Sequence, residues 1–223
     1  MKYFKIPALL IFLVFCSCKS TAQQDFDPAY VKVTNERAQK IVDNLAISNT
    51  KKELKVRDLI AGQYRALSKI QENEEAELAV VKTSKMSEEL KQSKKEAITS
   101  KVDAETKKLH KQYLKSLKKQ LNDKQVTEVK DGMTYGVVEI TYEGYQDMLP
   151  ELGKEEKEYI YKNLVEAREL AMDAGSSKEK HAWFGKYKGR INNYLSQRGY
   201  DLNAESEAWH KRIEARKKEE NNN

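Results

Sequence analysis

The chain has 223 residues, 34% of them charged and 39% hydrophobic, which is enough for one domain of ordinary size. This charge-rich composition, with three prolines and nine glycines, favours long exposed helices over a thick core. The net charge of +6 is concentrated in residues 82–119, with twelve lysines against five acidic residues, and in residues 1–22, with three lysines and no acid. The rest of the chain is therefore acidic overall, and since it contains no known nucleic-acid-binding motif we do not expect a nucleic-acid partner.

Residues 1–22 have the pattern of a signal peptide. Two lysines precede the apolar run 6–15, which is too short to span a membrane comfortably, and small residues follow it. We expect cleavage after Ala22 and export, most simply to the periplasm. The alternative is lipidation of Cys18, which would make the mature protein an outer-membrane lipoprotein with a lipid anchor as its membrane attachment. Both cysteines lie in this leader, so disulfides and cysteine catalysis are not expected.

The remainder of the chain reads as a helical protein. After a short tether at 23–28, residues 29–216 are expected to form a single helical domain, followed by a disordered tail at 217–223. A first helix is predicted at 29–47, and a second follows it with apolar residues at heptad-like spacing. These patterns place the fold in the all-α class, as a multi-helix bundle.

Residues 74–121 contain no Pro or Gly and have a thin apolar stripe. The pattern predicts one long helix, or two joined end to end. So narrow a stripe favours a helical hairpin that projects from the bundle with lysines on its outer face. The lysines are typical of a solvated helix face, and contact with an acidic polymer or a membrane surface is the functional alternative.

The residue composition changes after a short helix predicted at 122–130. The segment 137–142, VVEITY, is rich in β-branched residues and lies between glycines, which predicts one strand-like segment. Because a lone strand is not stable by itself, we expect an extended connection laid across the helices. Tyr135 and Tyr142 lie at its ends and are candidates for a sugar-stacking surface, although such tyrosines more often complete a core.

Two further helices are predicted at 154–174 and 176–199, joined by a tight turn into an antiparallel hairpin. Ser176 and Glu179 match a capping box at the start of the second helix. A last helix is predicted to begin after Asn203.

The helix predicted at 176–199 carries the strongest binding signal. Gly185 and Gly189 lie on one face, and each costs about 1 kcal/mol relative to alanine in a helix interior. A second helix packed closely over them is the favoured explanation, and a ligand that approaches the backbone is the alternative. The aromatic and basic side chains beside them could hold an anionic or sugar ligand, and the competing interpretation is a solvated basic face on a core helix. The candidate binding residues are His181, Trp183, Tyr187, Lys188, Arg190, Asn193, Tyr135 and Tyr142.

The sequence contains no complete catalytic motif, so we name no catalytic residue. The three histidines, His110, His181 and His210, are widely spaced, and neither a metal nor a cofactor is expected. The acidic residues have helix-surface spacing, so no carboxylate pair of a glycosidase can be chosen. A polysaccharide lyase is the enzymatic alternative, because that chemistry needs a cation at the carboxylate and a base such as Tyr, Lys or His.

Two segments, 121–125 and 152–156, each place a leucine four residues before an amide or acid at a helix start. This arrangement is similar to the Leu-Thr-x-x-Gln motif of the periplasmic helical chaperones Spy and CpxP, although the threonine is absent both times. The similarity implies a Spy-like chaperone or adaptor as an alternative function, with the lysine-rich hairpin as its working surface.

The C-terminal half resembles an exported family of Bacteroidota proteins, the domain of unknown function 3826. The segments that carry the resemblance are VKDGMTYG at 129–136, ARE at 167–169, AMDAGSSKEKH at 171–181 and FGKYKGRINNYL at 184–195. The likeness extends more weakly back to Tyr30. It implies a setting among polysaccharide-utilisation genes, often beside pectin-degrading enzymes, and supplies no catalytic residue. We therefore expect an exported, non-catalytic accessory protein that binds a glycan, with acidic glycans among the candidates, or a protein partner in the cell envelope.

Overall fold

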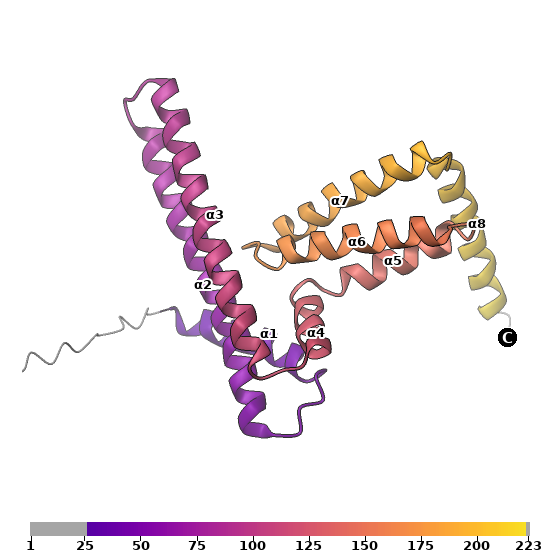
Figure 1. Ribbon diagram of the computed structural model, residues 1–223, viewed down its shortest axis with the longest axis horizontal. Coiled ribbons are helices and arrows are strands. Elements are labelled where there is room, and N and C mark those ends of the chain that lie inside the picture. The colour runs from indigo at the N-terminus through magenta and orange to yellow at the C-terminus, as the bar shows by residue number, and fades with distance from the viewer. Residues whose placement is uncertain (1–25, 222–223) are drawn as a thin grey trace, which may run out of the picture.

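The computed structural model describes residues 26–221, which form eight α-helices and no β-strand in that range (Figure 1). This confirms the all-α, multi-helix architecture. The predicted signal peptide, the alternative lipidation site Cys18 and the start of the tether lie outside the described residues. Within 26–221, no helix has both the length and the apolar composition needed to cross a membrane. The helices are α1 (Pro28–Val42), α2 (Thr50–Thr83), α3 (Glu88–Lys118), α4 (Asp123–Met133), α5 (Val137–Met148), α6 (Lys154–Ala171), α7 (Ser177–Gln197) and α8 (Leu202–Asn221).

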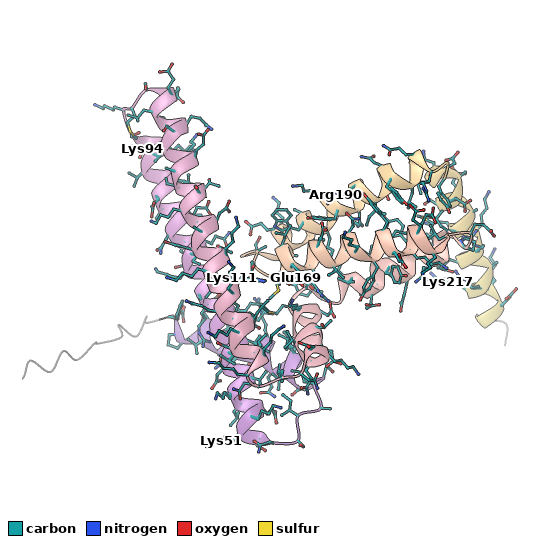
Figure 2. All side chains as sticks on the ribbon, in the orientation of Figure 1. Lys51, Lys94, Lys111, Glu169, Arg190 and Lys217 are labelled. Atoms are coloured by element: carbon teal, nitrogen blue, oxygen red, sulfur yellow. The ribbon has the colours of Figure 1, made fainter. Side chains whose placement is uncertain are left out.

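The helices α2 and α3 form a long antiparallel hairpin that projects beyond the other helices in Figure 1. The chain turns at 84–87, within residues 74–121, which were predicted to form one long helix or two joined end to end. Serines make this turn: Ser84 and Ser87 have extended backbone, and the Ser87 side chain accepts a hydrogen bond from the Leu90 N–H. Serine ends helices in this way because its side chain competes for backbone hydrogen bonds. Lysines line the outside, as Figure 2 shows for Lys94 near the tip.

The base of the hairpin, α1 and α4 enclose the first of two hydrophobic cores. The helices α1 and α4 approach closely at Gly132, where a β-carbon would lie 2.9 Å from Cγ1 of Ile41. A capping box starts α4: the side chains of Asn122 and Gln125 each accept from the other's backbone N–H, and the Gln125 amide also donates to the Leu45 carbonyl. The buried residues of this first core include Val42, Val56, Ile60, Leu117, Val129 and Met133.

The segment 137–142, expected to be a strand-like extended connection, is instead the first half of α5. That prediction is wrong because the same apolar positions fit a helix: Val138 and Tyr145, seven residues apart, are both buried in the second core. The preference of β-branched residues for strands is weak, and burial of a helical stripe outweighs it. Gly136, with a φ of 66°, precedes the helix as a left-handed turn residue rather than bounding a strand.

The helices α5, α6, α7 and α8 surround the second core. As predicted, α6 and α7 are antiparallel neighbours and α7 starts with the Ser176–Glu179 capping box. The helix α8 is fastened to the end of α5, where Trp209 and Arg216 donate to the Asp147 carboxylate at 2.6 and 2.7 Å. Hydrogen bonds from Arg216 and then Trp209 lower the pKa of Asp147 to about 2. Beyond this contact α8 stays helical to the last described residue, through most of the tail that was expected to be disordered. The buried residues of this second core include Leu149, Ile160, Leu164, Phe184, Ile191 and Leu195.

The two cores meet where α4 lies beside the C-terminal end of α6, near Glu169 in Figure 2. Arg168, 5% exposed, donates to the Asp131 carboxylate at 2.8 Å, and Lys130 donates to Glu169 at 2.6 Å. Met172, at the C-terminal end of α6, is also buried in the first core. The relative position of the two halves therefore depends on hydrogen-bonded ion pairs as well as on this apolar contact.

Candidate functional site

The structure divides the candidate residues of α7 between an outer and an inner face. Arg190 and Asn193 lie on the outer face and are exposed, as Lys188 is, while Trp183 is half-buried. Tyr187 points inward and is 7% exposed, so its ring belongs to the second core. Tyr187 therefore packs in the second core, and it can contribute to a surface site only through the side chains that contact it.

The other candidates lie elsewhere. Tyr142 of α5 packs edge-on against Tyr161 of α6, with ring centroids 5.2 Å apart, and both line a separate hollow between these helices. Tyr135 precedes α5 and stacks on His181 at the start of α7, with centroids 5.8 Å apart and an interplanar angle of 19°. The predicted set is therefore spread over three places, and only the outer face of α7 keeps several of its members together.

The two glycines of α7 face open space. A β-carbon at Gly185 or Gly189 would meet no atom within 4 Å beyond its adjacent residues and its own helix backbone. The favoured explanation, a second helix packed closely over the glycines, is therefore wrong for the described residues. The glycines leave a strip of bare helix backbone, at a cost of about 1 kcal/mol each against alanine.

Beside this strip, a surface hollow of about 550 Å³ lies between α6 and α7. Tyr159 of α6 and Tyr194 of α7 stack in it with their ring centroids 3.8 Å apart and an interplanar angle of 17°. Both rings are half-buried and pack on the second core, so contacts with the core fix their positions. We call this hollow the α7 groove. Its lining residues are Tyr159, Lys186, Gly189, Arg190, Asn193, Tyr194 and Gln197.

Arg190 is held in a defined position at the edge of the α7 groove. Its guanidinium donates to Asn163 Oδ1 at 3.4 Å and to Glu166 Oε2 at 3.3 Å, and its Cζ lies 4.4 Å from the centre of the Tyr187 ring. The side chain remains 49% exposed. Arg190 is therefore positioned in advance but still has exposed donors for a ligand.

Arg198 braces the other end of the groove. It pairs with Glu155 and Glu156 at the start of α6, and its Cζ lies 5.5 Å from the centre of the Tyr194 ring. Hydrogen bonds to Glu156 and Glu155 raise the pKa of Arg198, and its guanidinium in turn lowers the pKa of Glu156. The pKa of Tyr194 is also raised, first of all by desolvation. This ion-paired arginine holds the Tyr194 ring against α6, and its positive charge opposes the rise in the pKa of Tyr194.

The same face of α7 continues toward its N-terminus. The Lys186 ammonium lies 5.1 Å from the centre of the Trp183 ring, and both side chains line a small hollow next to the α7 groove. Trp183 and Tyr194 are eleven positions apart, which is about 16 Å along a helix. The face therefore offers two aromatic surfaces with cationic and amide groups between them.

Sequence reasoning missed several groove residues. Tyr194 was not among the candidates, and Tyr159 lies on another helix, with no sequence pattern that links it to Tyr194. Lys186 and Gln197 are exposed like many other polar residues. The available signal was the helical spacing of 186, 189, 193 and 197, which places these positions on one face with the bare glycine.

The residues that line the α7 groove are of types that bind ligands. Its lining consists of aromatic rings, amides and cations, and it includes no Ser, Cys or His. Among residues 26–221, no group of three or more His, Cys, Asp or Glu is placed to hold a metal ion. Aromatic faces flanked by convergent hydrogen-bond donors suit a ligand that has apolar faces and polar edges.

The fold and the groove define an all-helical protein with two cores, a projecting lysine-rich hairpin and an aromatic surface on one exposed helix. The chain belongs to the family described as "Protein of unknown function (DUF3826)", which matches residues 31–215. This match confirms the family resemblance and covers nearly all the described residues. No significant match is found among curated proteins.

Proposed function

We propose that the protein is exported and binds a glycan in the α7 groove, as a non-catalytic accessory in polysaccharide utilisation. The observation that carries this proposal is the stacked pair of Tyr159 and Tyr194, 3.8 Å apart, beside a hollow lined with exposed donors. Sugar rings pack their apolar faces on aromatic side chains, and their hydroxyls need hydrogen-bond partners. A protein of the cell envelope is the alternative partner.

The bare backbone at Gly185 and Gly189 supports a ligand that lies directly on α7. Of the two explanations for these glycines, close helix packing is excluded within the described residues. A ligand that approaches the backbone accounts for a helix stability cost of about 2 kcal/mol in total.

The charge of the groove favours an acidic glycan. Lys186 and Arg190 line it, and Arg190 is the better anion donor because its guanidinium is already oriented by Asn163 and Glu166. Binding of an acidic polymer to these exposed cations should weaken with added salt, whereas stacking on the tyrosines should persist.

Affinity electrophoresis of the purified protein through neutral and acidic polysaccharides tests the proposal, with the same samples assayed for cleavage products. We expect retardation without cleavage by at least one polysaccharide. Tyr194→Ala should weaken that interaction about tenfold, because stacking on one ring is removed. Cleavage products would instead support the polysaccharide-lyase alternative.

Gly189→Gln provides a variant that keeps every core contact. A side chain at this position meets open space, so the fold should be retained while the groove is filled. Lys188→Gln is the matched control, because Lys188 is exposed on the same helix but does not line the groove. Equal retardation of both variants and the unchanged protein would refute the assignment of the site to this groove.

A Spy-like chaperone or adaptor function is the second candidate, favoured by exposed apolar residues near the hairpin tip. Val80 is 69% exposed and Leu90 is 46% exposed, among many lysines. If this function is correct, the protein suppresses aggregation of an unfolded client, and Val80→Ser with Leu90→Ser reduces the suppression. Failure to protect a client at an equimolar ratio would count against it.

A further inference from the structure

A second and deeper hollow, which we call the junction hollow, lies where the two cores meet. It has a volume of about 670 Å³ and is bounded by α1, α2, α4, and the turn between α6 and α7. Three cations and three aromatic rings from α1, α2, the turn before α5 and the start of α7 line it. They are Arg37, Lys40, Lys180, Tyr30, Tyr64 and Tyr135.

The acidic residues in this hollow are occupied by other partners. Asp131 accepts from the buried Arg168 at 2.8 Å, and Glu128 lies 3.8 Å from Lys124 on the same helix. Among residues 26–221, no ion pair joins Arg37, Lys40 or Lys180 to a carboxylate. The three cations of the junction hollow therefore have no direct carboxylate partner in this range, although Asp173 and Glu179 act on Lys180 from a longer distance.

Lys180 is the most deeply placed of these cations, at 5% exposed. Its ammonium donates to the carbonyls of Ala171 and Met172 at 3.1 and 3.3 Å, which leaves one of three N–H groups. Burial lowers the pKa of Lys180 to about 8; Asp173 and Glu179 act in the opposite sense, and Arg37 adds to the lowering. An anion bound beside Lys180 would favour its charged form.

The aromatic wall has an unusual backbone. Tyr135 has a φ of 61°, in the left-handed region that glycine adopts without strain. Its position just after α4 needs such a φ because the chain turns there, with Gly136 N–H donating to the Asp131 carbonyl at 2.8 Å. A glycine would satisfy the turn, but this position is a tyrosine. The residue is 54% exposed, and its ring stacks on that of His181. Strained residues of this kind cluster at ligand sites.

Tyr64 forms the facing part of this wall. It is half-buried, and its pKa is raised to about 12, first by burial and then by the neighbouring Tyr135. The Tyr64 phenol is therefore neutral at physiological pH and can donate a hydrogen bond to a ligand hydroxyl.

We propose that the junction hollow binds a small sugar acid, with its carboxylate between Arg37 and Lys180 and its ring against Tyr135. The guanidinium of Arg37 matches the two oxygens of a carboxylate, while the buried ammonium of Lys180 supplies a fixed charge. The tyrosine hydroxyls would form hydrogen bonds with the hydroxyl groups of the sugar. A ligand therefore needs both a carboxylate and a sugar ring to bind tightly. This site does not rest on the α7 groove. The two share only the helix α7, which contributes Lys180 near its N-terminal end to the junction hollow.

Isothermal titration of the purified protein with glucuronate, glucose and inorganic phosphate tests this site. Glucuronate should bind saturably, glucose about tenfold more weakly because it lacks the charge, and phosphate about tenfold more weakly because it lacks the ring. Absence of saturable glucuronate binding, or equal binding of phosphate or glucose, would overturn the proposal.

Variants separate this site from the α7 groove. Arg37→Gln should weaken glucuronate binding about tenfold and leave retention of a polysaccharide on the groove unchanged. Lys32→Gln, an exposed position on the same helix, is the matched control and should bind as the unchanged protein does. An Arg37→Gln protein with unaltered glucuronate affinity would remove the assigned carboxylate site. Tyr194→Ala should show the reverse pattern, so failure of either site is seen independently.

The variant Tyr135→Gly distinguishes a ligand-binding role of the Tyr135 ring from a purely structural one. Glycine relieves the left-handed backbone, so Tm should rise while glucuronate affinity falls. A higher Tm with unchanged affinity would show that the ring serves no ligand.

Discussion

The α7 groove and the junction hollow are both lined by tyrosines and cations, but they are built differently. The groove lies on one helical hairpin, and its cations are exposed: the Arg190 side chain is 49% accessible. The junction hollow is assembled from four parts of the chain, beside Arg168, whose side chain is only 7% accessible. Substitutions in the groove should therefore leave the fold intact, whereas the junction hollow lies among the contacts that join the two cores.

The largest expected effect on stability is at the junction. Arg168→Ala would leave the Asp131 carboxylate without its 2.8 Å partner at a mostly buried position. Because an uncompensated buried charge is costly, we expect a loss of about 3 kcal/mol in the free energy of unfolding, measured by urea denaturation. Lys101→Ala removes an exposed pair with Glu77 on the hairpin and should cost less than about 1 kcal/mol. Similar losses of unfolding free energy for the two variants would contradict the expected difference between the junction and the hairpin surface.

Alanine in place of glycine should have opposite effects in the two regions. At Gly132 a β-carbon would lie 2.9 Å from Ile41, whose branched side chain is packed in the first core. We expect Gly132→Ala to destabilise by about 1–2 kcal/mol through overpacking. Gly189→Ala meets open space and should stabilise by about 1 kcal/mol through helix propensity. Thermal unfolding followed by circular dichroism measures both, and destabilisation by Gly189→Ala would show that the groove is not open.

The smallest effect is a pH dependence at the junction. His110 Nδ1 lies 2.7 Å from Asp173, and the pKa of His110 is raised by this contact first, with Glu169 raising it further and burial and Lys130 opposing. A raised folded-state pKa stabilises the fold fully below the unfolded value of about 6.5, and this contribution is lost as the pH rises through the folded pKa.

The urea midpoint should therefore fall as the pH rises from about 6, by no more than the equivalent of about 1 kcal/mol. His110→Gln should flatten this dependence, and His210→Gln, an exposed position on α8, is the control. A slope unaffected by His110→Gln would assign the dependence to other groups.

Much of the helical layout could be predicted, because helices are encoded by spacing that is local in the sequence. The Ser176–Glu179 capping box, the α6–α7 hairpin and the projecting lysine-rich hairpin follow from caps, turns and apolar stripes. The strand-like interpretation of 137–142 failed because local preference is weaker than burial, and a short apolar run fits either period.

The candidate sites were predictable only in part. Arg190 and Asn193 were identified because they lie beside the glycines on one helix face. Tyr159 was missed because its stacking on Tyr194 joins residues 35 positions apart.

The sequence by itself determined that the chain is helical, where most helices begin and end, and which family it belongs to. Only the tertiary structure decided that α7 exposes its glycines, that Tyr159 completes the groove, and that Arg37 and Lys180 share one hollow. The physical reason is the distance along the sequence over which each interaction acts. Caps and periodicity act within a turn or two of helix, whereas a site depends on packing between distant segments, which local preferences do not specify.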